Sequence, residues 1–191
     1  MTSPRGRSPL ALTVLALLQY KPLHPYGIQR LIKQWGKDKV VNVGQRTSLY
    51  RTIDRLTAAG LIRVRETERD QAYPERTVYE ITDLGRDVAR DWLLDMLATP
   101  KQEFPEFPAA LSHLLMLPPQ QIGDALERRA DTLDEASAAL DRDRSAGSAH
   151  GLPRIALLED EYLRVLMAAE SQWLRSVVDD LRSGGLIWSP A

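Results

Sequence analysis

Residues 43–81 constrain the fold more than any other segment, because the pattern changes there from helical to extended within a few positions. Three apolar residues recur at helical spacing: Leu49, Ile53 and Leu56. Gly60 then provides a helix stop, and residues 61–65 and 77–81 alternate apolar with polar side chains, as half-buried strands do. The segment predicts an amphipathic helix followed by a β-hairpin whose long polar tip spans residues 68–74.

Composition narrows the class of protein. A chain of 191 residues with 43% hydrophobic residues can form one domain or two small ones, each with a buried core. The absence of cysteine excludes disulfides, a thiolate nucleophile and a cysteine zinc site, and it agrees with a reducing cytoplasm. No apolar run reaches the roughly 18 residues of a membrane span, and residues 10–18 lack a following signal-peptide cleavage pattern. We therefore expect a cytoplasmic protein that makes no use of a membrane.

The small net charge of -1 conceals an asymmetry between the two halves of the chain. Residues 1–99 carry a net charge of +5, whereas residues 100–191 carry -6. Within residues 1–65 there are 12 basic and 2 acidic side chains, a net charge of +10. Such an excess is typical of a surface that faces phosphate groups, although a merely solvated basic face is the alternative.

Three further helices are predicted around the helix and hairpin. Ser8 before Pro9 is a suitable N-cap for a helix over residues 10–18 that is apolar nearly all round. This helix needs partners on several sides, so we expect burial against both its own domain and a second subunit. A proline-bounded turn leads to a second helix over residues 26–35, which Gly36 ends. After the hairpin, Thr82 caps a helix that runs towards Leu97.

The sequence of the second half of the chain predicts helices. Residues 101–108 contain helix-breaking prolines and predict a linker or a tight entry into the next helix, which is a short helix over residues 109–117. Two long amphipathic helices then flank a flexible turn at residues 145–151, and the last helix carries an apolar stripe from Ile155 to Val177. An antiparallel helix hairpin of this kind has more apolar surface than two helices can bury between themselves. We expect a homodimer through these helices; the alternative is a monomer whose hairpin packs on the first domain.

These patterns together predict a mostly α fold with a small β-hairpin. The predicted organisation is a winged helix-turn-helix domain at residues 1–99 followed by an α-helical dimerisation domain at residues 100–191. A helix with a β-hairpin wing fits the major groove of double-stranded DNA and contacts its phosphates.

Four segments resemble the PadR-type winged-helix transcriptional regulators. They are Pro-Leu-His-Pro-Tyr at 22–26, Thr-Ser-Leu-Tyr-Arg at 47–51, Asp-Arg-Leu-Thr-Ala-Ala-Gly-Leu-Ile at 54–62, and residues 76–82 leading into Asp-Leu-Gly. The resemblance covers residues 9–97, and residues 118–182 look like the long paired helices of one subgroup. It implies a sequence-specific DNA-binding regulator, a repressor acting as a homodimer and released by a small aromatic effector.

The chain departs from the family pattern in three places. Pro25 replaces the glycine of the usual His-Gly-Tyr, which stiffens the entry to the second helix. The wing tip lacks the usual glycines and carries Glu68 and Asp70, which weakens any expectation of deep wing contacts. Thr77 and Val78 replace the usual lysine and tyrosine. Specificity is therefore expected from the recognition helix more than from the wing.

Candidate DNA contacts follow from how a helix enters the groove. Its first turn meets base edges, which makes these residues the expected readers: Gln45, Arg46, Thr47 and Ser48. Contacts that fix the register on phosphate are expected from Tyr26, Tyr50, Arg51, Arg69, Tyr73 and Arg76. Arg55 and Arg63 are expected to contribute through charge alone. As alternatives, Tyr50 is an aromatic at the edge of the core, and Arg46 pairs with Asp54 or another acidic residue.

Enzymatic function is not expected. The chain has only three histidines, far apart, and no phosphate-binding loop, nucleophile elbow or metal-ligand spacing. The acidic groups within residues 131–135 and 159–161 read as solvated helix faces, so neither a metal nor a cofactor is predicted. The runner-up function is a winged-helix module that binds proteins instead of DNA, and the charge of +10 in residues 1–65 argues against it.

An effector site is only weakly indicated. Aromatic and sulfur-containing side chains that can line an apolar pocket are Trp92, Phe104, Phe107, Met167 and Trp173. Trp92 and Trp173 are the candidate effector contacts. Ordinary core and interface packing is the alternative for all five.

Overall fold

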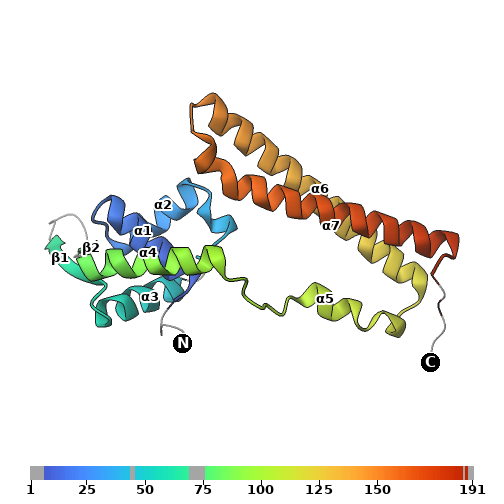
Figure 1. The fold of residues 1–191 in the computed structure, drawn as a ribbon, viewed down its shortest axis with the longest axis horizontal. Coiled ribbons are helices and arrows are strands. Elements are labelled where there is room, and N and C mark those ends of the chain that lie inside the picture. Colours follow the sequence, from blue (N-terminus) through green and yellow to red (C-terminus); the bar gives the residue numbers. More distant parts are fainter. Residues whose placement is uncertain (1–6, 44–45, 69–75, 187, 189–191) are drawn as a thin grey trace. The chain divides into compact units, whose positions relative to one another are not determined.

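The computed structural model describes residues 7–43, 46–68, 76–186 and 188. The chain separates into two compact units, residues 1–102 and residues 103–191, and each is described by itself. The first unit contains α1 (Pro9–Tyr20), α2 (Pro25–Gln34), a 3-10 turn η1 (Lys37–Lys39), α3 (Arg46–Ala58), β1 (Ile62–Glu68), β2 (Arg76–Ile81) and α4 (Asp83–Ala98) (Figure 1). The second contains α5 (Glu106–Leu111), η2 (Leu114–Met116), α6 (Pro119–Ala149), η3 (Arg154–Leu157) and α7 (Leu158–Ser183). The predicted fold class, mostly helical with a hairpin wing, is confirmed.

The predicted caps fix where the helices of the first unit begin. The Ser8 hydroxyl accepts a hydrogen bond from the Ala11 amide at 3.1 Å, and Pro9 takes the first helical position. The Thr82 hydroxyl accepts from the Gly85 amide at 3.0 Å and so starts α4. Each hydroxyl satisfies an amide that has no partner within its helix.

One hydrophobic core holds the first unit together, and α1 lies within it. Its apolar side chains are buried on several sides, with Val14 and Leu15 fully inaccessible. Ile28 and Ile32 of α2, the apolar stripe of α3 and Trp92 of α4 belong to the same cluster. The partners that the apolar α1 requires are therefore supplied by its own unit.

The wing is an antiparallel pair that is longer than the sequence pattern indicated. Ile62 pairs with Ile81 and Val64 with Tyr79, and the register then shifts between Val64 and Glu66. β1 continues to Glu68 because a bulge interrupts the alternation on which the predicted end at Arg65 rested.

Beta-type pairing also reaches the entry to α2. The backbone amide and carbonyl of Leu23 form hydrogen bonds of 3.0 and 2.9 Å with the carbonyl and amide of Tyr79. The wing strand β2 is thus tied directly to the residues that start α2.

In the second unit, three predicted boundaries are wrong. α5 begins at Glu106 and not at Ala109, because Pro108 falls in the first turn, where a missing amide hydrogen costs no helical bond. α5 also ends at Leu111 and not at Leu117, and η2 follows it. α6 continues through the predicted turn at residues 145–151 as far as Ala149. Gly147 is a packing position within that helix, since a Cβ there would lie 3.0 Å from Leu157 Cδ2. The true connection begins at His150 and includes Gly151, with a φ of +77°.

The predicted helix hairpin is present, and polar pairs between α6 and α7 show that it is antiparallel (Figure 1). Partners on α7 descend in number as those on α6 ascend: Glu127 with Arg182, Asp131 with Arg175, Asp134 with Ser171, and Asp141 with Arg164. Hydrogen bonds from Ser171 and Arg175 hold the pKa of Asp134 below its usual range. The acidic groups within residues 131–135 therefore include residues that hold the hairpin in register.

The apolar stripe predicted on α7 does not provide its packing against α6. Leu174 and Val178 face α6 and form a small core with Ile122 and Leu126. Most of the predicted stripe is instead exposed, at Ile155, Leu158, Tyr162, Val165 and Trp173. α7 therefore carries a second apolar face, on the side away from α6. No helix in the described part of the chain is long and apolar enough to cross a membrane.

Candidate nucleic-acid interface

The recognition helix α3 has the two faces that its sequence predicts. Leu49, Ile53 and Leu56 are buried, and each keeps 2% or less of its surface accessible. The residues exposed on the opposite side are Thr47, Arg51, Asp54 and Ala58. Burial of the apolar stripe fixes the rotation of the helix about its axis, and therefore decides which side chains are offered to a ligand.

One flank of this outward face is a cationic hollow. Thr47, Ser48, Arg51, Thr52 and Arg55 line a depression of about 420 Å³. Thr52 is buried, and its hydroxyl donates to the Ser48 carbonyl at 2.9 Å, which fixes this part of the lining in place. Among the residues that the structure describes, neither arginine forms an ion pair. Two guanidinium groups beside a polar hollow suit a phosphate oxygen.

The other flank faces the wing and is aromatic. Tyr50 is 52% exposed, and within the described chain its hydroxyl forms no hydrogen bond, which favours the DNA contact over the core-edge alternative. Tyr79 of β2 lies nearby: burial raises its pKa, and the charges of Asp54 and Tyr50 raise it further. Tyr79 therefore joins the wing to α3, a role the sequence pattern did not indicate beyond placing it on one face of the strand.

Tyr26 is presented by the capped start of α2. Its side chain is 60% exposed and its ring lies parallel to that of His24, with centroids 6.1 Å apart. The Nδ1 atom of His24 accepts a hydrogen bond from the Gly27 amide at 3.0 Å. Pro25 occupies the first helical position, where proline fits without loss of a helical bond. The departure from the family pattern at this position is thus accommodated, and His24 is a capping residue that sequence reasoning did not single out.

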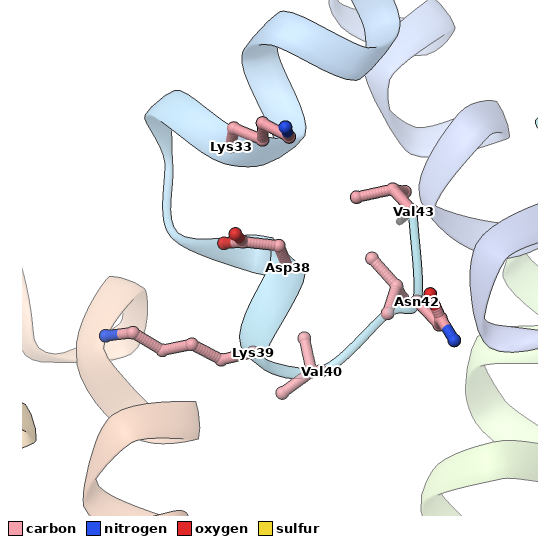
Figure 2. A pocket seen from close by; sticks show the side chains of 7 residues that line it. Lys33, Asp38, Lys39, Val40, Asn42 and Val43 are labelled. Carbon is pink, nitrogen blue, oxygen red and sulfur yellow. The ribbon is translucent and has the colours of Figure 1, made fainter. Parts of the chain in front are cut away.

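The loop before α3 carries further positive charge. Lys33, Asp38 and Lys39 stand on one side of a depression of about 530 Å³, and residues 40–43 form the rest of its wall. Figure 2 shows Lys33 on α2, the Asp38 carboxylate below it, and Val43 where the chain continues towards α3. Positive charge thus lies on the approach to the recognition helix as well as on the helix itself.

Several predicted contacts fall outside the described residues. Gln45, Arg69 and Tyr73 lie in segments that the structure does not describe. Arg46 and Arg76 are placed by their backbone at the starts of α3 and β2, but their side chains are not described. Their roles, and the alternative pairing of Arg46 with Asp54, stay predictions.

Comparison with known proteins identifies the family. Residues 14–91, which include α3 and the wing, match the profile of the transcriptional regulator PadR-like family. Residues 14–91 form a PadR-like domain. DNA binding in transcriptional regulation is the role of this domain family, and the expectation that the chain is not an enzyme rests on this match. No curated protein matches the sequence.

Solved structures of PadR-like proteins extend the likeness over the long C-terminal helices. Bacillus subtilis PadR in complex with operator DNA has a TM-score of 0.73 and 19% identity, with 91% of this chain and 99% of that chain covered. The same protein in complex with p-coumaric acid has a TM-score of 0.70 and 19% identity, with 91% and 98% covered. The Vibrio cholerae virulence activator AphA has a TM-score of 0.68 and 18% identity, with the same coverage. At these identities the likeness shows the fold.

The two candidate effector contacts have different surroundings. Trp92 is 5% exposed in the core of the first unit, whereas Trp173 of the second unit packs edge-to-face on Phe107, with ring centroids 6.4 Å apart. The Arg129 guanidinium lies 3.8 Å from the Phe107 ring centroid and donates to Glu170 at 2.6 Å. Phe107 also lines a cavity of about 330 Å³ beside α5, η2 and α6. No group of His, Asp and Glu residues in the described part of the chain is arranged to hold a metal ion.

Proposed function

We propose that this PadR-like regulator binds operator DNA as a homodimer and represses transcription. The observation that carries the proposal is the outward face of α3, where Arg51 and Arg55 form no ion pair with any residue that the structure describes, on a half of the chain with a positive net charge. Such a surface suits double-stranded DNA, which is a polyanion whose major groove admits an α-helix. Because this ligand is chromosomal DNA, we place the protein in the cytoplasm.

Specific residues receive distinct roles in this proposal. Bases are read by the start of α3, at Gln45, Arg46, Thr47 and Ser48. Phosphates are held by Tyr26, Tyr50, Arg51, Arg69, Tyr73 and Arg76. The exposure of Thr47, Tyr50, Arg51 and Tyr26 supports these roles, since each is available to a ligand without repacking the core. Arg55, on the wall of the cationic hollow, is added to the phosphate contacts.

Binding to duplex DNA over a range of salt concentrations tests the function. Each phosphate that the protein neutralises releases counterions, so the logarithm of affinity should fall linearly with the logarithm of salt concentration. The duplex is taken from the region upstream of the protein's own gene, with an unrelated duplex as the control. Negligible affinity at low salt, or affinity insensitive to salt, would favour the protein-interaction module instead.

Two substitutions separate phosphate contacts from base contacts. Arg51→Ala should weaken binding to all duplexes by about the same factor and lower the salt slope by about one. Gln45→Ala should change the ranking of duplex sequences, because glutamine can pair bidentately with adenine. Titration of both variants against one panel of duplexes provides the measurement. An unchanged ranking would remove Gln45 from the readers.

The dimer is proposed on the exposed apolar face of α7. Leu158, Tyr162, Val165 and Trp173 are exposed along one side of a single helix, which is unusual for a surface that remains in water. A two-fold interface covers such a face with a second copy of itself and presents two recognition helices to two half-sites. We accordingly assign DNA binding to residues 1–99 and dimerisation to residues 100–191.

The direction of regulation and the effector are proposed by analogy with structural relatives. Bacillus subtilis PadR has been solved with operator DNA and with p-coumaric acid, whereas AphA is described as an activator. We propose repression, with release by a small aromatic molecule near Trp92 or Trp173. Such a molecule releases DNA only if it binds the DNA-free arrangement more tightly than the DNA-bound one.

A further inference from the structure

An acidic side chain stands in the outward face of the recognition helix. Asp54 is exposed on the same side of α3 as Thr47 and Arg51. Within the described residues it forms no ion pair, although Arg51 and Arg55 are close to it in sequence. A carboxylate at this place is repelled by the phosphates that the surrounding arginines suit, so its role differs from theirs.

The position of Asp54 around the helix axis decides what it can reach. At 100° per residue, Thr47, Arg51, Asp54 and Ala58 form the middle of the exposed face, opposite the buried stripe. Tyr50 lies towards the wing, and Ser48 and Arg55 lie on the opposite flank. When a helix enters a groove, the middle of its outward face meets the floor and its flanks meet the walls.

Side-chain length separates Asp54 from Arg51, its neighbour on the same face. The arginine is long enough to lean sideways to the phosphates, and it lines the cationic hollow together with Arg55. The aspartate has one methylene group, so its oxygens stay above the middle of the face. Ala58 lies one turn after Asp54, and its small side chain does not prevent the helix from approaching the floor of the groove. The chemistry within reach of the carboxylate is therefore the edges of bases.

We propose that Asp54 is a specificity-determining residue that accepts a hydrogen bond from the exocyclic amino group of a cytosine in the major groove. Cytosine N4 and adenine N6 are the base-edge donors of this groove, and guanine and thymine offer only acceptors and a methyl group there. Adenine N6 lies beside the N7 acceptor, which repels a carboxylate, so cytosine is the base that Asp54 favours. The inference rests on the proposed operator binding and adds one base preference to it.

Burial of the carboxylate in the groove makes such a contact selective. Asp54 lies close enough to Tyr79 for its charge to raise the pKa of that tyrosine, in addition to the larger effect of burial. Formation of the complex removes water from the carboxylate. A hydrogen bond between a charged acceptor and an amine is stronger where water is excluded, and an unpaired carboxylate there is correspondingly more costly. A wrong base at this position is therefore penalised.

Selection from a pool of randomised duplexes tests the proposal with the full-length chain. Wild type should enrich cytosine at one position of each half-site. Asp54→Asn should shift that position towards adenine, with which asparagine pairs bidentately, and Asp54→Ala should lose the preference there. The preferred base should be favoured by about tenfold over the others in wild type and by much less in Asp54→Ala. Other positions of the half-site should keep their preferences.

Asp91→Asn is the matched control, because it removes the same charge from an exposed site on α4 that is not part of the interface. It should leave the base preferences unchanged. If both Asp54 variants bind every duplex more tightly by one factor with unchanged preferences, the carboxylate is only repulsive and the inference is overturned. A loss of binding to all duplexes by variants that melt like wild type would also overturn it. If wild type itself binds no duplex in a salt-dependent way, the proposed function fails first.

Discussion

Replacing Gly85 with alanine should strongly destabilise the N-terminal unit. Gly85 lies in the first turn of α4 beneath the Leu61 carbonyl, and a Cβ there would overlap the Leu61 oxygen and lie 2.9 Å from Ile81 Cγ1. The same carbonyl accepts hydrogen bonds from the Thr82 amide at 3.0 Å and the Thr82 hydroxyl at 3.1 Å, so it cannot move away without breaking the cap. We expect a loss of about 3–5 kcal/mol, a large part of a typical domain stability of about 5–15 kcal/mol.

Denaturant unfolding with a matched glycine variant measures this effect. Gly123 is also buried and helical, but a Cβ there would meet nothing within 4 Å. Gly123→Ala should therefore stabilise the protein by up to about 1 kcal/mol, through the better helix propensity of alanine. A Gly85→Ala variant as stable as wild type would mean that α4 and Leu61 are not in contact as described.

Most helix boundaries of the first unit could be predicted from signals in the local sequence. Ser8, Gly60 and Thr82 mark helix boundaries through hydrogen bonds and dihedral angles that involve only near neighbours, so the sequence alone places them. The apolar stripe on α3 predicts its buried face correctly because only that side of the helix packs into the core of the first unit. These are the features from which the exposure of Thr47 and Arg51 could be predicted.

Contacts between distant segments could not be predicted in this way. The backbone pairing of Leu23 with Tyr79 joins residues 56 positions apart, and nothing in either segment indicates the other. The nearness of Tyr79 to Tyr50 and Asp54 follows from the same tertiary arrangement. The wing side of the candidate interface therefore became visible only in the folded chain.

Apolar periodicity also failed to tell two helix faces apart. On α7, both the side that packs on α6 and the side that is exposed carry apolar residues, and the larger ones are exposed. The side that packs on α6 also contains small polar residues such as Ser171, which donates a hydrogen bond to Asp134 of α6. The predicted turn at residues 145–151 is largely helical for a similar reason, since small residues fit a flexible turn and a closely packed helix equally well.

Introducing a charge into the exposed face of α7 should separate the dimer and weaken operator binding. Val165 is 52% exposed in the chain, near Tyr162 on the same face. In the proposed dimer Val165→Glu would bury an unpaired carboxylate at a two-fold interface, where the two copies also repel each other. Once the protomers separate, the second half-site no longer benefits from a tethered partner, so operator affinity should fall by about a hundredfold.

The control variant places the same charge on the other helix of the hairpin. Ala138 is exposed on α6, near the polar residues Glu135 and Arg142. The Ala138→Glu variant should leave both the mass measured by sedimentation and the operator affinity unchanged. A Val165→Glu protein that sediments as a dimer would show that this face is not the interface. A monomer that keeps wild-type operator affinity would instead mean that one recognition helix suffices, so that the two half-sites are read independently.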